Sequence, residues 1–65
     1  MMAKFIEVQT LIHGEDVLIN VDSIIAIKRE LPKNYAIIYM IANDDQPTYY
    51  IVYNYDEVIK RIQAL

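Results

Sequence analysis

Two stretches in the C-terminal half of the chain, residues 35–41 (YAIIYMI) and 49–53 (YYIVY), are apolar or aromatic throughout. A strand in a half-solvated antiparallel sheet alternates apolar and polar side chains, because successive residues point to opposite faces. These two segments do not alternate, so both faces of the sheet that they form need to be covered. A chain of 65 residues can cover one face with its remaining elements and has little left for the second. We therefore expect the second face to be covered by self-association.

The composition bounds the class of protein. The length allows one small domain, residues 1–65, and a chain of this size buries only about 60% of the surface that it exposes when unfolded. The sequence contains no cysteine, which excludes disulfides and thiolate zinc sites and leaves oligomerisation as the available stabilising device. The N-terminus lacks a basic segment followed by an apolar run, and no stretch approaches the roughly 18 apolar residues of a membrane span. We predict a cytoplasmic protein.

Periodicity and turn residues predict five strands. Gly14 suits the positive φ of a tight turn, the Asn20-Val-Asp-Ser segment favours a kink or one helical turn, and Pro32 ends the third strand. Residues 43–47 predict the turn of a last hairpin. The expected strands are Lys4–Ile12, Val17–Val21, Ile24–Arg29, Tyr35–Ile41 and Thr48–Tyr53.

The C-terminal segment predicts a helix. Asn54 is a candidate N-cap with Glu57 three residues later, Asp56 adds negative charge to the first turn, and Lys60 and Arg61 follow. A helix of roughly ten residues is marginal alone in water, so we expect it to dock on the sheet. Its apolar residues, which fall at the spacing of one face, are Val58, Ile59, Ile62 and Leu65.

The predicted fold is a single α+β domain, a small meander-like antiparallel sheet of four to five strands followed by one C-terminal helix. The pattern leaves open whether residues 35, 37 and 39 or residues 36, 38 and 40 face the helix, because a one-residue shift exchanges the rows. Tyrosine is enriched at protein interfaces, so we favour the tyrosine-rich row at a subunit contact. The alternative is that the rings lie flat on the sheet with their hydroxyls in water. The predicted interface residues are Tyr35, Ile37, Tyr39, Tyr49, Ile51 and Tyr53.

No residue pattern predicts catalysis. His13 with Glu15 and Asp16 has the residue types of a metal or acid/base cluster, but one glycine turn without a second histidine favours a solvated turn. Asp44 and Asp45 lack the spaced acidic pattern of a calcium loop. There is no nucleophile triad and no glycine-rich phosphate loop. We therefore predict a protein that is not an enzyme, with no catalytic, cofactor-binding or metal-binding residues.

The charge argues against broad contact with nucleic acid, since the net charge is −3 and only six residues are basic. The prediction is instead a non-enzymatic protein-interaction or regulatory module that forms a homo-oligomer, through the sheet face or a paired strand edge, with room for a further protein partner. The alternative is a single-stranded nucleic-acid-binding module, in which sheet tyrosines stack on bases. The residues that this alternative would use are Tyr39, Tyr49, Tyr53, Lys28 and Arg29.

Two segments resemble the small flagellar and swarming-motility protein family of bacteria. Residues 12–24 (IHGEDVLINVDSI) match its glycine turn, strand and Asn-Pro-Asp followed by isoleucine, and residues 49–59 (YYIVYNYDEVI) match its Tyr-x-Val strand leading into Glu-Glu-Val-Ile. The chain departs from the family at Val21, where the family has proline, and at residues 43–47, where it has a glycine-bearing hairpin. The resemblance implies a short strand-rich unit ending in a helix, no enzyme and a bacterial interaction or regulatory role.

Overall fold

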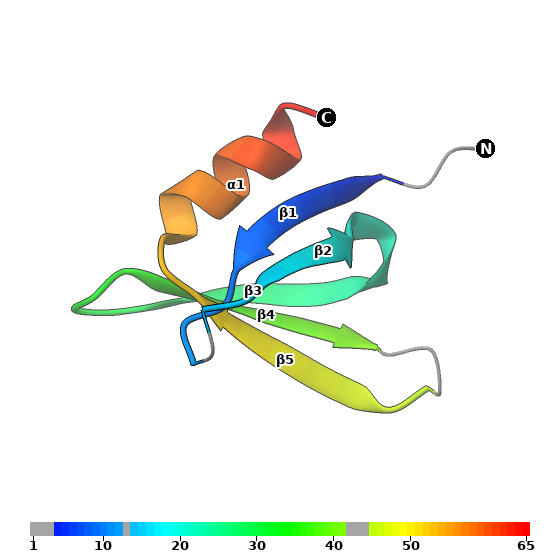
Figure 1. Cartoon of the computed structure of the whole chain (residues 1–65), viewed down its shortest axis with the longest axis horizontal. Coiled ribbons are helices and arrows are strands. Elements are labelled where there is room, and N and C mark those ends of the chain that lie inside the picture. The colour runs from blue at the N-terminus through cyan, green and yellow to red at the C-terminus, as the bar shows by residue number, and fades with distance from the viewer. Residues whose placement is uncertain (1–3, 13, 42–44) are drawn as a thin grey trace.

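The computed structural model describes residues 4–12, 14–41 and 45–65, and it has five strands, one 3-10 turn and one helix (Figure 1). The fold class is α+β, with antiparallel strands and a C-terminal helix, as the sequence predicts. The elements are β1 (Phe5–Gln9), β2 (Asp16–Asn20), η1 (Val21–Ser23), β3 (Ile24–Glu30), β4 (Tyr35–Ile41), β5 (Pro47–Val52) and α1 (Tyr55–Gln63).

The strands divide into two sheets, which the sequence pattern does not predict. β1 pairs with β2 in one sheet, and β3, β4 and β5 form a meander in the other. The two sheets are joined where β1 ends, through an antiparallel bridge between Thr10 and Val52 and a 2.8 Å hydrogen bond from the Leu11 N–H to the Ile51 carbonyl. The β1–β2 pair can therefore fold over the three-stranded sheet and enclose a core.

The core lies between the two sheets and is closed by α1. The helix contacts β4 and β1, and Figure 1 shows it beside β1. On β4 the row that faces this core is Ala36, Ile38 and Met40, which settles the row left open by the sequence. The remaining core residues are Ile6 and Val8 from β1, Ile19 from β2, Val52 from β5 and Val58 from α1.

β1 is shorter than predicted because the chain turns at Thr10. The Thr10 N–H donates to the Glu15 carbonyl at 2.8 Å, and its own carbonyl accepts from the Gly14 N–H at 3.0 Å. The Thr10 hydroxyl also accepts from the Glu15 N–H, so this buried polar side chain is satisfied. Gly14 has φ +63°, the left-handed conformation expected of the glycine in this turn. The strand predicted to reach Ile12 therefore ends at Gln9.

A single 3-10 turn connects the two sheets, as the Asn20-Val-Asp-Ser segment predicts. The Asn20 side chain accepts from the Asp22 N–H at 3.0 Å and caps the turn. β3 then begins with an irregularity in its pairing with β4 between Ile24 and Ala26, which leaves Ile25 in a bulge. The turn and the bulge redirect the chain, so β3 pairs with β4 and does not extend the first sheet.

The helix begins as predicted. The Asn54 side chain accepts from the Glu57 N–H at 3.1 Å and caps the first turn. Val58 is buried, and Ile59 and Ile62 are half-buried. Leu65, which the spacing assigns to the same apolar face, lies beyond the end of the helix and is exposed.

The turn between β3 and β4 is tied to the start of the helix. Asn34 has φ +62°, its carbonyl accepts from the Tyr55 N–H at 2.9 Å, and its side-chain amide donates to Asp56 at 2.9 Å. The Leu31–Pro32 peptide bond in the same turn is cis. One asparagine therefore bonds to a helix residue that lies 22 positions later in the sequence.

We predict that Ile38→Ala lowers the free energy of unfolding by about 2–5 kcal/mol, because the substitution leaves a cavity at a fully buried site. This loss is comparable to the whole stability of a small domain. Ile25→Ala is the matched control, since Ile25 is exposed in the bulge, and it should cost far less. Urea denaturation at one protein concentration measures both. Equal losses would contradict the assignment of the core row.

Candidate functional site

The second face of the three-stranded sheet carries a patch of tyrosine and isoleucine. Side chains alternate along β4, so the row at positions 35, 37 and 39 points away from the core row. On β5 the residues directly opposite are Tyr49 beside Tyr39 and Ile51 beside Ile37. We call this patch the tyrosine face, and its residues are Tyr35, Ile37, Tyr39, Tyr49, Ile51 and Tyr53.

The tyrosine face is made of two rows with the same order of residues. Tyr39 and Tyr49 have ring centroids 6.2 Å apart at one end, and Tyr35 and Tyr53 have ring centroids 6.5 Å apart in an edge-to-face arrangement at the other. Between the two ring pairs lie Ile37 and Ile51, which pair across the strands. Each strand therefore presents tyrosine, isoleucine and tyrosine toward the same side.

The rings remain partly open to solvent although they pack on each other. Tyr49 is 58% exposed, Tyr53 51% and Tyr39 37%. Ile37, at the centre of the patch, is only 9% exposed. At the middle of the tyrosine face Ile37 is therefore buried, whereas the tyrosine rings at the two ends are exposed. Large apolar patches are uncommon on the surfaces of monomeric proteins unless they bind something.

On the side of β3, two charged residues border the tyrosine face. Lys28 lies opposite Ile37 and Glu30 lies opposite Tyr35, so their side chains share this face of the sheet. Ala26, opposite Tyr39, completes the outward-facing row of β3. In the part of the chain that the structure describes, neither Lys28 nor Glu30 forms an ion pair.

Arg29 lies on the opposite side of the sheet from Lys28. It pairs with Ala36, a core-facing residue of β4, and its guanidinium donates to Asp56 at 2.9 Å. The guanidinium carbon is also 4.3 Å from the centroid of the Tyr55 ring. The predicted pair Lys28-Arg29 is therefore split, with one cation beside the tyrosine face and the other bound to the helix.

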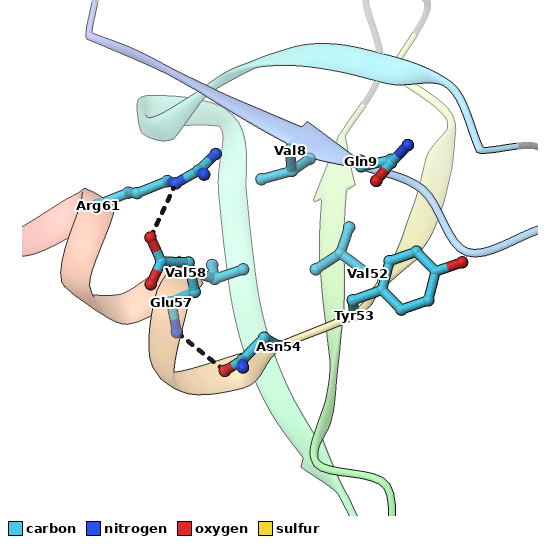
Figure 2. Close-up of a pocket in the computed structure, with 8 residues that line it drawn as sticks. All are labelled: Val8, Gln9, Val52, Tyr53, Asn54, Glu57, Val58 and Arg61. Carbon is cyan, nitrogen blue, oxygen red and sulfur yellow. Dashed lines mark hydrogen bonds and ion pairs between the residues drawn. The ribbon is translucent and has the colours of Figure 1, made fainter.

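A shallow depression of about 180 Å³ lies where β1, the end of β5 and the first turns of α1 meet (Figure 2). Figure 2 shows Val8, Val52 and Val58 at its apolar side and Glu57 with Arg61 on the helix. These two charged side chains form an ion pair at 3.5 Å, and Arg61 also donates to the Glu7 carbonyl. The volume of this depression is below the roughly 300 Å³ at which ligand pockets begin, so we assign no ligand to the depression.

The residues considered for metal binding do not assemble into a site where the structure describes them. Glu15 and Asp16 are exposed beside the first turn, and Asp45 is exposed before β5. His13 and residues 42–44, including Asn43 and Asp44, lie outside the described residues. Among the described residues, no group of three or more His, Cys, Asp or Glu side chains is arranged to hold a metal ion. The same residues include no helix with the length and apolarity needed to cross a membrane.

Comparison with known proteins adds no homologue. No family model, no curated protein and no solved structure matches the chain.

The register between the strands shows which residues share a face, and it can be compared with the grouping expected from the sequence. The six predicted interface residues do share one face, whereas Tyr50 and Tyr55 pack against the core. The role of Arg29 at the helix start was missed, and so was the placement of Glu30 beside Lys28. The placement of Glu30 beside Lys28 could have been predicted from the sequence, because residues two apart on a strand share a face.

We predict that Arg29→Ala lowers the free energy of unfolding by about 1 kcal/mol, since both partners of the ion pair are largely exposed and a stacked cation contributes modestly. Lys33→Ala is the matched control, because Lys33 is an exposed cation in the adjacent turn. Urea denaturation at low and high salt measures both, and the difference should shrink at high salt. Equal stabilities of the two variants at low salt would contradict the structural role of Arg29.

Proposed function

We propose that the chain is a non-enzymatic protein-interaction or regulatory module that self-associates through the tyrosine face. The observation that carries this proposal is the grouping of four tyrosines and two isoleucines on the sheet face that neither α1 nor the β1–β2 pair covers. Burial of such side chains is favourable by roughly 25 cal/mol for each Å² of apolar surface removed from water. Tyrosine supplies this area with few rotatable bonds, so little conformational entropy is lost on binding.

The strand edges support the face as the contact surface. β3 is an edge strand of its sheet, and it carries three consecutive charged residues, Lys28, Arg29 and Glu30, together with the bulge at Ile25. β2, one edge of the two-stranded sheet, has five residues and begins with Asp16. β5, the second edge of the three-stranded sheet, begins with Pro47 and is partly covered where the Leu11 N–H bonds to the Ile51 carbonyl. Charges, bulges and short length are the features by which proteins discourage edge-to-edge pairing. The six residues that make up the tyrosine face are uncharged.

The nucleic-acid alternative loses support from the position of Arg29. Base stacking on Tyr39, Tyr49 and Tyr53 would need cations nearby for the phosphates. Arg29 is bound to Asp56 on the other side of the sheet, which leaves Lys28 as the cation of the outward-facing row of β3, with Glu30 next to it. A net charge of −3 adds a general repulsion of phosphate.

The resemblance to the small flagellar and swarming-motility family belongs to the same proposal. It supports a bacterial module that acts in the cytoplasm by contact with itself or with another protein, without catalysis. The sequence features behind it are the glycine turn at Gly14 and the strand that leads through Asn54 into the helix.

We predict that Tyr39→Glu dissociates the oligomer, because the substitution places a carboxylate without a partner in a desolvated contact. Gln63→Glu is the matched control, since it adds the same charge at an exposed position on α1. Light scattering after size-exclusion chromatography, across a hundredfold dilution and at two salt concentrations, measures the mass of each. The wild type and Gln63→Glu should show the same oligomer.

A monomeric wild type at every concentration would refute self-association. An unchanged mass for Tyr39→Glu, with its melting temperature also unchanged, would exclude this row from the contact. Circular dichroism of Tyr39→Glu separates dissociation from unfolding, because a dissociated but folded variant keeps its spectrum.

A further inference from the structure

The two charges beside the tyrosine face are opposite in sign and are set two residues apart on one strand. Lys28 and Glu30 are both exposed, and their α-carbons are separated by about 7 Å along β3. Their cross-strand neighbours are Ile37 and Tyr35, so the charges border one half of the patch. In the described segments of the chain both lack an ionic partner. β3 therefore places one positive and one negative side chain beside the uncharged tyrosine face.

We propose that the partner of the tyrosine face is a second copy of this chain, related by a two-fold axis, in which Lys28 of each copy pairs with Glu30 of the other. This inference rests on the proposed self-association and adds its geometry and the residues that set its specificity. A two-fold contact is self-complementary: if one residue of the first copy contacts a different residue of the second, the same contact is repeated with the two copies exchanged. Opposite charges placed as Lys28 and Glu30 are satisfied by this symmetry without any other molecule.

The position of the axis follows from the register. We place the axis midway between the three-stranded sheets of the two copies, perpendicular to the strands and at the level of Arg29 and Ala36. This axis sets Lys28 opposite Glu30 of the second copy. The same axis sets Ile37 opposite Tyr35 of the second copy and Ile51 opposite Tyr53 of the second copy, because these residues are at matching levels. Tyr39 lies three levels from the axis and therefore meets the β3–β4 turn of the second copy. Stacked sheets lie about 10 Å apart, a distance that an extended lysine and glutamate span together.

The local charges of Lys28 and Glu30 complement themselves in a second copy, although the overall charge does not favour association. The chain carries a net charge of −3, so two copies repel each other except where opposite charges meet. The contact described above brings two cations and two anions together, and it is neutral in sum. Complementary charges at the rim of an interface select the partner and its orientation more than they add affinity.

The test is an exchange of these charges. The proposed dimer has two equivalent contacts between residue 28 of one copy and residue 30 of the other. In Lys28→Glu, two carboxylates meet at each contact. In Glu30→Lys, two ammonium groups meet at each contact. Each single variant should dimerise about tenfold more weakly or worse, since like charges then meet twice in the contact. The double variant Lys28→Glu/Glu30→Lys restores opposite charges and should dimerise like the wild type.

The decisive measurement is a mixture of the two single variants. Lys28→Glu presents only negative charge at these positions and Glu30→Lys only positive charge, so an equimolar mixture should form the heterodimer in preference to either homodimer. Native mass spectrometry resolves the three species when one variant is uniformly labelled with a heavy nitrogen isotope, since Lys and Glu residues are nearly equal in mass. The heterodimer should exceed the half of all dimers that random pairing gives.

Control variants separate this effect from overall charge. Lys4→Glu and Asp22→Lys change the net charge by the same amounts at exposed positions away from the tyrosine face. Their mixture should give random pairing. Partner choice of equal strength in this control would overturn the assignment to Lys28 and Glu30.

The outcomes distinguish this inference from the proposed function. A monomeric wild type refutes self-association and the inference together. A dimeric wild type whose Lys28→Glu and Glu30→Lys variants mix at random refutes the paired charges and leaves self-association standing. An oligomer that is lost in Tyr39→Glu but tolerates both charge variants likewise refutes the two-fold arrangement alone.

Discussion

The structure depends on β4 being apolar on both sides. As the central strand of its sheet, it is paired on both edges, and its side chains must be covered above and below. The β1–β2 pair and α1 cover the side of Ala36, Ile38 and Met40, and they use most of the remaining chain to do so. Among the described residues, we find the other side flanked by side chains of β3 and β5 alone. That asymmetry leaves one apolar sheet face available for contact with another molecule.

The helix contributes to the fold by position more than by its own stability. With nine residues it has few internal hydrogen bonds, and Val58 is its one fully buried side chain. Its N-terminus is held by Asn54 from within and by Asn34 and Arg29 from the sheet. These contacts keep α1 on the core side of the sheet, away from the tyrosine face.

The sequence predicted local structure well and spatial arrangement less well. The bounds of β4, the 3-10 turn after Asn20 and the Asn54 cap follow from side-chain properties within a few residues, and all three are confirmed. The early end of β1 depends on hydrogen bonds of Thr10, and the division into two sheets depends on how β1–β2 folds back over the rest. Which row of β4 is buried, and which side Arg29 takes, follow from register between strands. The use of the tyrosine face in self-association stays a prediction.

The Asn34 junction bears on how the chain opens and closes. The β1–β2, β3–β4 and β4–β5 pairs are all hairpins between neighbours in sequence, which gives the fold a low contact order and favours rapid folding. The bonds from Asn34 to Tyr55 and Asp56 make the β3–β4 turn and the helix start one cooperative unit. Amide hydrogens in the β3–β4 turn and at the helix start should therefore exchange with solvent together, as one foldon.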